Sequence, residues 1–505
     1  MKKLLSVILS AILVFTLVPF GVFAAGKCTC GKDPIIMVNG LGNTIYQGDR
    51  VVFPPQKDTI VNAVKQAIPM TPAIIGGKLS DTQLEKFLEV AETFFAPIAF
   101  DVNGDPINGV GARFSYPTDE NHKEGDFIYF DYDWRVDPFV TAAQLKDFID
   151  YVKELTGHDS VYLAGESMGT IMMNTYLATY GFEGINGVVW YNGAYNCVAT
   201  CSDSYANKNK FEADALGRFL AQTGVNTGNQ FLNDLFAALT ESGLLETVFN
   251  SVTDIADDLE KSGRFSRFLN ETIGTMPGFW ALVSSENFDD AVEFVFPTPE
   301  LKEKYAGLIE RITRYHDEVG SQVDNIMAEA QQITGKVGVV AGYGSVLAPV
   351  TADNLQQSDG VIGTAAESNG ATCAPYGSCF AENYTQAVDC GHNHISADRE
   401  IDASTCFFPE NTWFVKYGKH NLGSYGKTIC NRIFFSDGFN VFSDPTLPQF
   451  LLRDEATGAV SPLTVENGAD IQAKTTFTSK ILSFFFRITE RFISLFKALR
   501  GMIIK

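Results

Sequence analysis

The chain has 505 residues, 45% hydrophobic composition and a formal charge of −22 at neutral pH. Disordered chains are poor in apolar residues and nucleic-acid-binding domains are basic, so composition excludes both classes. The length allows about three domains of roughly 150 residues, but a single α/β enzyme with insertions also reaches this size.

The first segment, residues 1–24, is predicted to be an export signal. Lys2 and Lys3 precede an apolar stretch from Leu4 to Phe23, and Val22-Phe23-Ala24 fits a cleavage site. An uncleaved signal anchor is the alternative, because the stretch is nearly long enough to span a bilayer. We therefore expect a secreted or extracytoplasmic protein.

Alternating strand-like and helical segments are predicted across residues 33–200, the first part of a core. Strand-like runs occupy 34–38, 126–131, 160–164 and 187–191, and helical patterns occupy 82–95, 138–155 and 168–180. This alternation predicts a mostly parallel sheet with helices on both faces.

A helical insertion is predicted over residues 201–336, which are rich in Phe and acidic residues. The core then resumes over 337–435, with strand character at 337–343, through the Gly-rich stretch 359–370 and at 412–416, and with a helix after His420. Residues 436–478 form a C-terminal extension in this interpretation.

The tail, residues 479–505, is predicted to form a basic amphipathic helix. Polar or small residues recur along it every three or four positions, and apolar residues occupy most of the positions between them. The recurring residues are Lys480, Ser483, Arg487, Glu490, Arg491, Ser494, Lys497 and Gly501. Such a helix can lie in a membrane interface, and the alternative is a helix docked on its own domain.

Nine cysteines are present, and in an exported chain disulfides are expected, with at least one thiol left over because the number is odd. Cys390, His392 and His394 alternate, so on a strand they share one face, as metal ligands can. A disulfide at Cys390 beside two surface histidines is the other interpretation and the one we adopt. No metal and no other cofactor is therefore expected.

A G-x-S-x-G pattern, Gly165-Glu166-Ser167-Met168-Gly169, lies between a strand-like run and a helical run. In this context the Ser occupies a tight turn that raises its hydroxyl above the edge of the sheet, and the glycines leave room for the turn. Ser167 is therefore the predicted nucleophile, with Gly165 and Gly169 shaping the turn.

A Ser hydroxyl needs a base, and an acid that orients the base. We expect His420, which follows a predicted strand, to be the base, with His392 and His394 as the alternatives. Asp359, in a turn after a late strand, is the expected acid, with Asp353 as the alternative.

Backbone N–H groups must also stabilise the oxyanion that forms on attack. Met168 directly follows the nucleophile, and Leu41 lies in the loop after the first strand. Both are predicted oxyanion-hole donors.

Several segments together resemble the lecithin:cholesterol acyltransferase-like branch of the α/β-hydrolases. The segments are Asn39-Gly40-Leu41-Gly42, Tyr132-Asp133-Trp134-Arg135, the Gly165–Gly169 turn, Asp359-Gly360-x-Ile362 and Met276-Pro277-Gly278-Phe279-Trp280-Ala281-Leu282. The chain departs from this family at Asn39, where many relatives carry His, and in its long acidic insertion.

The resemblance implies an α/β-hydrolase fold in which the insertion is a large helical lid, with Trp280 and Phe279 near the substrate. It implies acyl transfer from a lipid ester through an acyl-Ser167 intermediate, without a cofactor and without nucleic acid as a partner. Hydrolysis is the leading expectation. An O-acyltransferase and a non-catalytic surface binding protein on the same fold are the alternatives.

Overall fold

The computed structural model describes residues 28, 30–67, 79–118, 125–210, 261–421 and 423–467, with isolated positions between 211 and 260. The predicted signal segment 1–24 and the predicted tail helix 479–505 lie outside these ranges. None of the helices within the described ranges combines the length and apolar character required to cross a bilayer.

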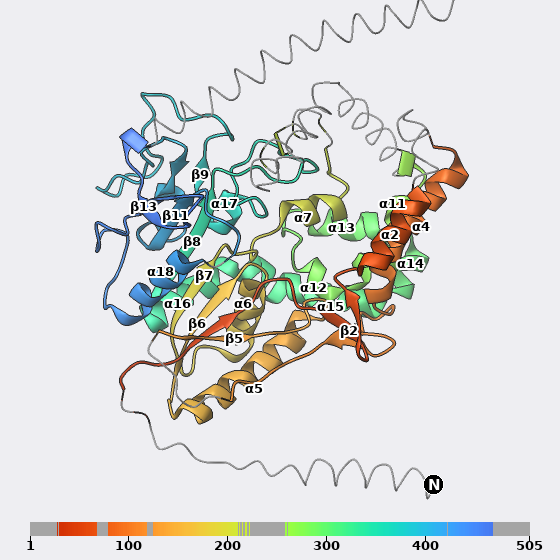
Figure 1. Ribbon diagram of the computed structural model, residues 1–505, viewed down its shortest axis with the longest axis horizontal. Helices are drawn as coiled ribbons and strands as arrows, with labels where there is room; N and C mark the ends of the chain where they lie inside the picture. The colour runs from red at the N-terminus through yellow and green to blue at the C-terminus, as the bar shows by residue number, and fades with distance from the viewer. Residues whose placement is uncertain are drawn as a thin grey trace, which may run out of the picture.

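The centre of the protein is an eight-stranded sheet in the order β13-β12-β11-β8-β7-β6-β1-β5 (Figure 1). All neighbouring pairs are parallel except β12 and β13. The strands are β1 (Ile35–Val38), β5 (Phe127–Phe130), β6 (Val161–Glu166), β7 (Ile185–Tyr191), β8 (Val337–Tyr343), β11 (Thr412–Lys416), β12 (Phe450–Arg453) and β13 (Val460–Pro462). The prediction of a mostly parallel sheet is confirmed, and the architecture is compatible with an α/β-hydrolase.

Both faces of the sheet are covered by helices. Successive residues of a strand point to opposite sides, and because the buried strands carry apolar residues on both sides, both faces must be buried. In β1, Ile36 and Val38 belong to one apolar cluster with α5 (Pro138–Thr156), α6 (Gly169–Tyr180) and α16 (Val323–Thr334). Ile35 and Met37 belong to another cluster with α18 (Ser424–Phe435). The continuous apolar runs of the sequence are therefore strands buried on both sides.

Two smaller sheets lie outside the central one. One contains β2 (Ile45–Gln47), β3 (Arg50–Phe53) and β4 (Val110–Ala112), and the other pairs β9 (Thr372–Cys373) with β10 (Ile401–Asp402). The remaining short elements near them are α2 (Lys57–Ala67), α4 (Asp81–Phe95), η2 (Ala96–Ile98), α17 (Thr364–Glu367), η5 (Ala403–Thr405) and η6 (Pro409–Asn411).

The described part of residues 201–336 contains helices and no strand. They are α7 (Ala199–Tyr205), α11 (Arg264–Glu271), η3 (Ile273–Thr275), α12 (Pro277–Trp280), α13 (Phe288–Val295), α14 (Pro299–Lys304), α15 (Ala306–Glu318), η4 (Gly320–Gln322) and α16. Most of them share an apolar cluster with α4, on the side of the molecule away from β13 (Figure 1). The last, α16, packs on β7 and β8 and connects these neighbouring strands.

Two expectations differ from the structure. The strand predicted within 359–370 is wrong: this stretch forms a turn followed by α17. The residues 436–478 were expected to lie outside the core, but they supply β12 and β13 to the edge of the central sheet.

Candidate active site

Ser167 lies in a tight turn between β6 and α6, with a left-handed backbone (φ 53°) that is unusual for a residue with a side chain. The flanking glycines are required by close contacts. A Cβ at Gly169 would lie 2.0 Å from the carbonyl oxygen of Val38, and one at Gly165 would lie 2.9 Å from Cα of Thr170. The turn therefore packs closely against the carboxyl end of β1.

Three side chains from separate parts of the sequence meet at this turn. Nε2 of His420 lies 2.8 Å from Oγ of Ser167, and Nδ1 of His420 lies 2.5 Å from Oδ2 of Asp359. Ser167 follows β6, Asp359 follows β8 and His420 follows β11, so all three come after the carboxyl ends of nearby parallel strands. The sheet order also reverses between β1 and β6, which is where α/β sheets bind ligands.

Asp359 is held in place from both sides of its carboxylate. Its Oδ1 accepts hydrogen bonds from the N–H groups of Val361 and Ile362 at 2.8 and 2.9 Å. Burial raises the pKa of Asp359, but the hydrogen bond and charge of His420, with hydrogen bonds from Glu367 and the N–H of Ile362, together lower it by more, so the net pKa is below its usual 3.8. Asp359 is therefore an anion that faces the imidazole at neutral pH.

His420 has a pKa above its usual 6.5. Burial lowers this pKa, but the hydrogen bond and charge of Asp359 outweigh burial. The loop that carries His420 is fixed by Asn192, whose side-chain amide donates to the carbonyl oxygens of Lys419 and His420 at 2.9 and 3.0 Å. Nδ1 of His420 donates to Asp359, which leaves Nε2 able to accept the proton of Ser167.

A second buried carboxyl, Glu367 on α17, contacts the acid. Burial and the neighbouring charge of Asp359 raise the pKa of Glu367 well above 4.5, so the group is neutral. If Glu367 were ionised, its Oε1 would be buried without a hydrogen-bond donor. When Glu367 is protonated, it donates a hydrogen bond to Asp359. Its Oε2 accepts from the N–H of Gly342 at 2.7 Å.

A cleft of about 240 Å³ opens at Ser167. Its walls are Asn39, Gly40, Leu41, Gly42, Asn43, Glu166, Ser167, His420 and Asn421. Leu41 therefore lies in the wall of the cleft, and Met168 occupies the N-cap position of α6 beside the nucleophile. Helix N-termini present unpaired N–H groups, which suits Met168 to stabilise an anion.

Asn39, where the resembled family carries His, also lies in this wall. Its amide donates to Oδ1 of Asp131 at 2.7 Å, just beyond the carboxyl end of β5. This bond fixes the loop that leads to Leu41.

Trp280 and Phe279 do not line the cleft. Trp280 is buried, donates from Nε1 to the carbonyl of Gly274 at 2.9 Å and stacks on Phe296. Phe279 packs edge-to-face against Trp134, with ring centroids 5.4 Å apart. Phe279 thus packs against both the helical cluster and the core, and Trp280 lies inside the helical cluster.

The alternative acid and bases lie elsewhere. Asp353 accepts from the N–H of Leu355 within its own turn. His394 is bound to Gln449, and His392 lies beside Glu410. Glu367 and Asn192 are the neighbours of the Ser–His–Asp group that sequence reasoning missed, and no motif marks either.

Comparison with known proteins adds little. No family model and no curated protein matches the chain. Among solved structures, the crystal structure of the Tle4-Tli4 complex aligns with 11% identity over 62% of this chain and 75% of that chain, with a TM-score of 0.28. A likeness at this score carries no argument about fold or function.

Proposed function

We propose that this protein is a serine hydrolase of the α/β-hydrolase fold that cleaves carboxylic esters through an acyl-Ser167 intermediate. The observation that carries the proposal is the continuous chain of hydrogen bonds from Ser167 through His420 to Asp359, with distances of 2.8 and 2.5 Å. An apo arrangement this close needs little rearrangement before proton transfer.

In the proposed reaction, Oγ of Ser167 attacks the ester carbonyl while Nε2 of His420 takes its proton. The carbonyl oxygen becomes an oxyanion, which the backbone N–H groups of Leu41 and Met168 stabilise. The ester C–O bond then breaks, and His420 returns the proton to the leaving alcohol. Water repeats these steps on the acyl enzyme, releasing the acid and restoring Ser167.

A lipid acyl ester is the proposed substrate class, in keeping with the family resemblance. Leu41 is the one aliphatic side chain among the described residues that form the wall of the cleft. A long acyl chain therefore needs further apolar wall, which we assign to residues 201–336 acting as a lid.

The test uses p-nitrophenyl esters of increasing acyl length and a fluorophosphonate probe, which labels only an activated Ser. Ser167→Ala should lower turnover by about 10⁴-fold or more and abolish labelling. Ser321→Ala is the matched control, because this exposed hydroxyl bonds only to nearby groups: it donates to the carbonyl of Asp317 and accepts from the side chain of Gln322.

Unchanged turnover in Ser167→Ala, or labelling at another serine, would refute the proposal. A wild-type protein that neither turns over esters nor labels would instead be the non-catalytic binding protein. An acyl product formed on an added lipid alcohol in competition with water would identify the acyltransferase.

A further inference from the structure

The loop between β9 and β10 brings together three side chains that can bind a metal ion. The thiol of Cys390 and one ring nitrogen each of His392 and His394 lie within 4.8 Å of one another. The nine cysteines carry free thiols in this structure, so the thiol of Cys390 is not in a disulfide. Bond lengths of about 2.0–2.3 Å place the ligand atoms of a tetrahedral zinc site about 3.3–3.8 Å apart, so the three atoms must approach one another by at most about 1.5 Å to bind one ion.

The hydrogen bonds of His394 show which ring nitrogen is available. Its Nδ1 lies 2.7 Å from Oε1 of Gln449. The amide nitrogen of Gln449 donates to the carbonyl oxygens of Pro409 and Thr412 at 2.6 and 3.2 Å, which fixes Oε1 as the acceptor. Nδ1 of His394 must therefore carry the proton, and Nε2 carries a lone pair.

That lone pair is buried and unsatisfied. His394 is 0% exposed, and its Nε2 has no hydrogen-bond partner among the described residues. A buried acceptor without a donor is costly, and a metal ion would satisfy it. A histidine whose other nitrogen donates to a carbonyl or carboxylate oxygen is also the arrangement that most metal-binding histidines adopt.

His392 and Cys390 complete the set from the solvent side. Nδ1 of His392 lies 3.6 Å from Oε1 of Glu410, so a carboxylate neighbours that nitrogen, and we assign Nε2 as the ligand atom. Cys390 is exposed, so its thiol is accessible to an entering ion. One thiolate with two imidazoles favours Zn²⁺ over the hard cations Ca²⁺ and Mg²⁺.

The backbone that carries these ligands is held in place without an ion. Nε2 of Gln386 donates to the carbonyl oxygens of Val388 and His392, both at 2.8 Å, and Oε1 of Gln386 accepts from the N–H of His394 at 2.9 Å. An ion that binds here has little loop entropy to overcome.

We propose that Cys390, His392 and His394 bind one Zn²⁺ ion, which cross-links the segment 390–394 of the β9–β10 loop and leaves one coordination position for water. The site is separate from the one at Ser167, and its role is independent of the proposed hydrolase activity.

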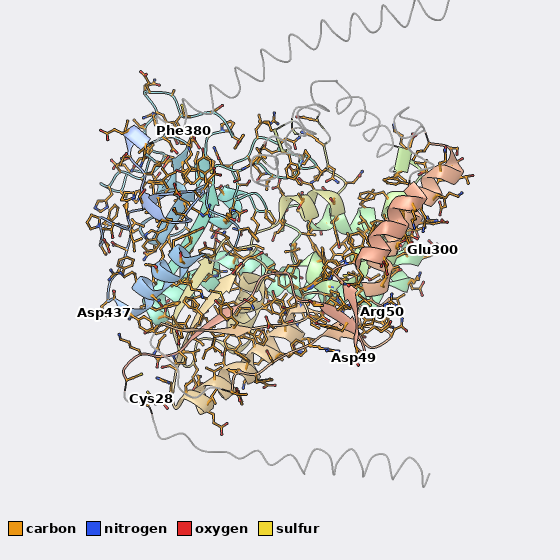
Figure 2. The ribbon with its side chains drawn as sticks, viewed as in Figure 1. Cys28, Asp49, Arg50, Glu300, Phe380 and Asp437 are labelled. Atoms are coloured by element: carbon orange, nitrogen blue, oxygen red, sulfur yellow. The ribbon has the colours of Figure 1, made fainter. Side chains whose placement is uncertain are left out.

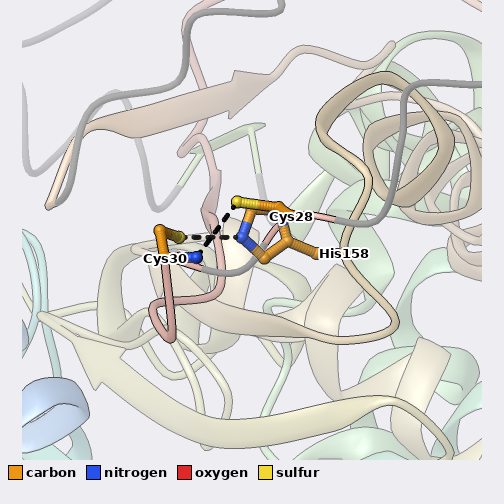
Figure 3. A group of neighbouring side chains, drawn as sticks. All are labelled: Cys28, Cys30 and His158. Carbon is orange, nitrogen blue, oxygen red and sulfur yellow. Dashed lines mark hydrogen bonds between the residues drawn. The ribbon is translucent and has the colours of Figure 1, made fainter.

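Another group, Cys28, Cys30 and His158, is the competing location for an ion (Figure 3). There Nε2 of His158 lies 3.3 Å from Sγ of Cys30, and Sγ of Cys28 accepts from the N–H of Cys30 at 3.4 Å. Figure 2 shows Cys28 near the lower edge of the ribbon and Phe380, in the first part of the β9–β10 loop, near its upper edge. The two groups share no residue, so variants can separate the two sites.

The experiment is a Co²⁺ titration of the purified full chain under reducing conditions, because Co²⁺ reports thiolate coordination in its visible spectrum. The expected result is one bound ion with a thiolate charge-transfer band. Cys390→Ser and His394→Ala should each weaken binding by about 100-fold or more, beyond the 10- to 100-fold typical of outer-shell changes. Cys379→Ser, at another exposed cysteine of the same loop, should bind as the wild type does.

Cys390 is exposed, so its variant keeps the test decisive even if His394→Ala fails to fold. Unchanged binding in Cys390→Ser would overturn the proposal, as would the absence of binding by the wild type. Loss of the signal in Cys30→Ser with retention in Cys390→Ser would assign the ion to the competing site. A disulfide at Cys390, found by mass spectrometry of protein purified without reductant, would also overturn it.

Discussion

Replacing Glu367 by Gln should leave both the activity and its pH dependence close to those of the unchanged protein. Burial and the charge of Asp359 keep the carboxyl of Glu367 neutral. A Gln amide can make the same two bonds: its nitrogen donates to Asp359, and its oxygen accepts from the N–H of Gly342. Glu367 is thus a positioning residue that acts through Asp359.

The distances around Glu367 give the shift in the pH–rate profile that we would expect if Glu367 were ionised instead. Carboxylate oxygens of Asp359 and Glu367 and a ring nitrogen of His420 lie within 4.8 Å of one another. Unit charges 4.8 Å apart interact by about 3.5 kcal/mol at an effective dielectric constant of about 20, which equals about 2.5 pH units. If Glu367 were ionised, it would hold the proton on His420, and Glu367→Gln would move the acid limb of the rate profile down by about that amount.

The assay is kcat/KM for a p-nitrophenyl ester, measured against pH for the wild type, Glu367→Gln and Glu367→Leu. Leu keeps the volume but removes the donor to Asp359 and leaves the N–H of Gly342 unpaired. Hydrogen bonds to charged groups contribute about 1.5–3 kcal/mol, so Glu367→Leu should lower kcat/KM about 10- to 100-fold. A downward move of the acid limb by more than about 1 pH unit in Glu367→Gln, or full activity in Glu367→Leu, would refute the reasoning.

Two further predictions concern His420 and Gly40. Because the pKa of His420 is raised, kcat/KM should fall as the pH is lowered, with a midpoint above pH 6.5; a midpoint below pH 6.5 would contradict this prediction. The folding stability gained from the raised pKa is complete below pH 6.5 and is lost as the pH rises through the pKa of the folded protein. Gly40→Ala would place a Cβ 2.9 Å from Cβ of Ser167, so it should reduce activity at least about 10-fold and lower the melting temperature. Gly42→Ala, with nothing within 4 Å, should leave the melting temperature unchanged, and an equal drop in melting temperature in the two variants would count against the clash.

The elements nearest the nucleophile are predictable because local signals agree there. Residues 161–164 form an uninterrupted apolar run, the turn contains two required glycines, and the helix after it ends at Gly181. The order of Ser167, Asp359 and His420 along the chain also limits the choice of partners. In this part of the chain, the local sequence pattern therefore predicts the structure that is observed.

The stretch 359–370 shows where local pattern misleads. Val361 and Ile362 between glycines look like part of a strand, but Oδ1 of Asp359 accepts hydrogen bonds from both of their N–H groups. Side-chain bonds to nearby backbone compete with a sheet ladder, and here they produce a turn.

Glu367 and Trp280 were beyond sequence reasoning for a different reason: their roles depend on distant neighbours. Glu367 is a helical Glu in sequence, and only the fold places it against Asp359. Trp280 donates to a carbonyl in its own segment and packs against aromatic rings on other elements, so its large apolar surface is buried within the helical cluster.

Because Ser167, His420 and Asp359 each follow a different strand, no short piece of this polypeptide can bring the three side chains together. Correct alignment requires β6, β7, β8 and β11 to be stacked side by side at their proper spacing. Counting reactive serines in a preparation would therefore count intact molecules, which gives a direct measure of refolding yield or of damage on storage.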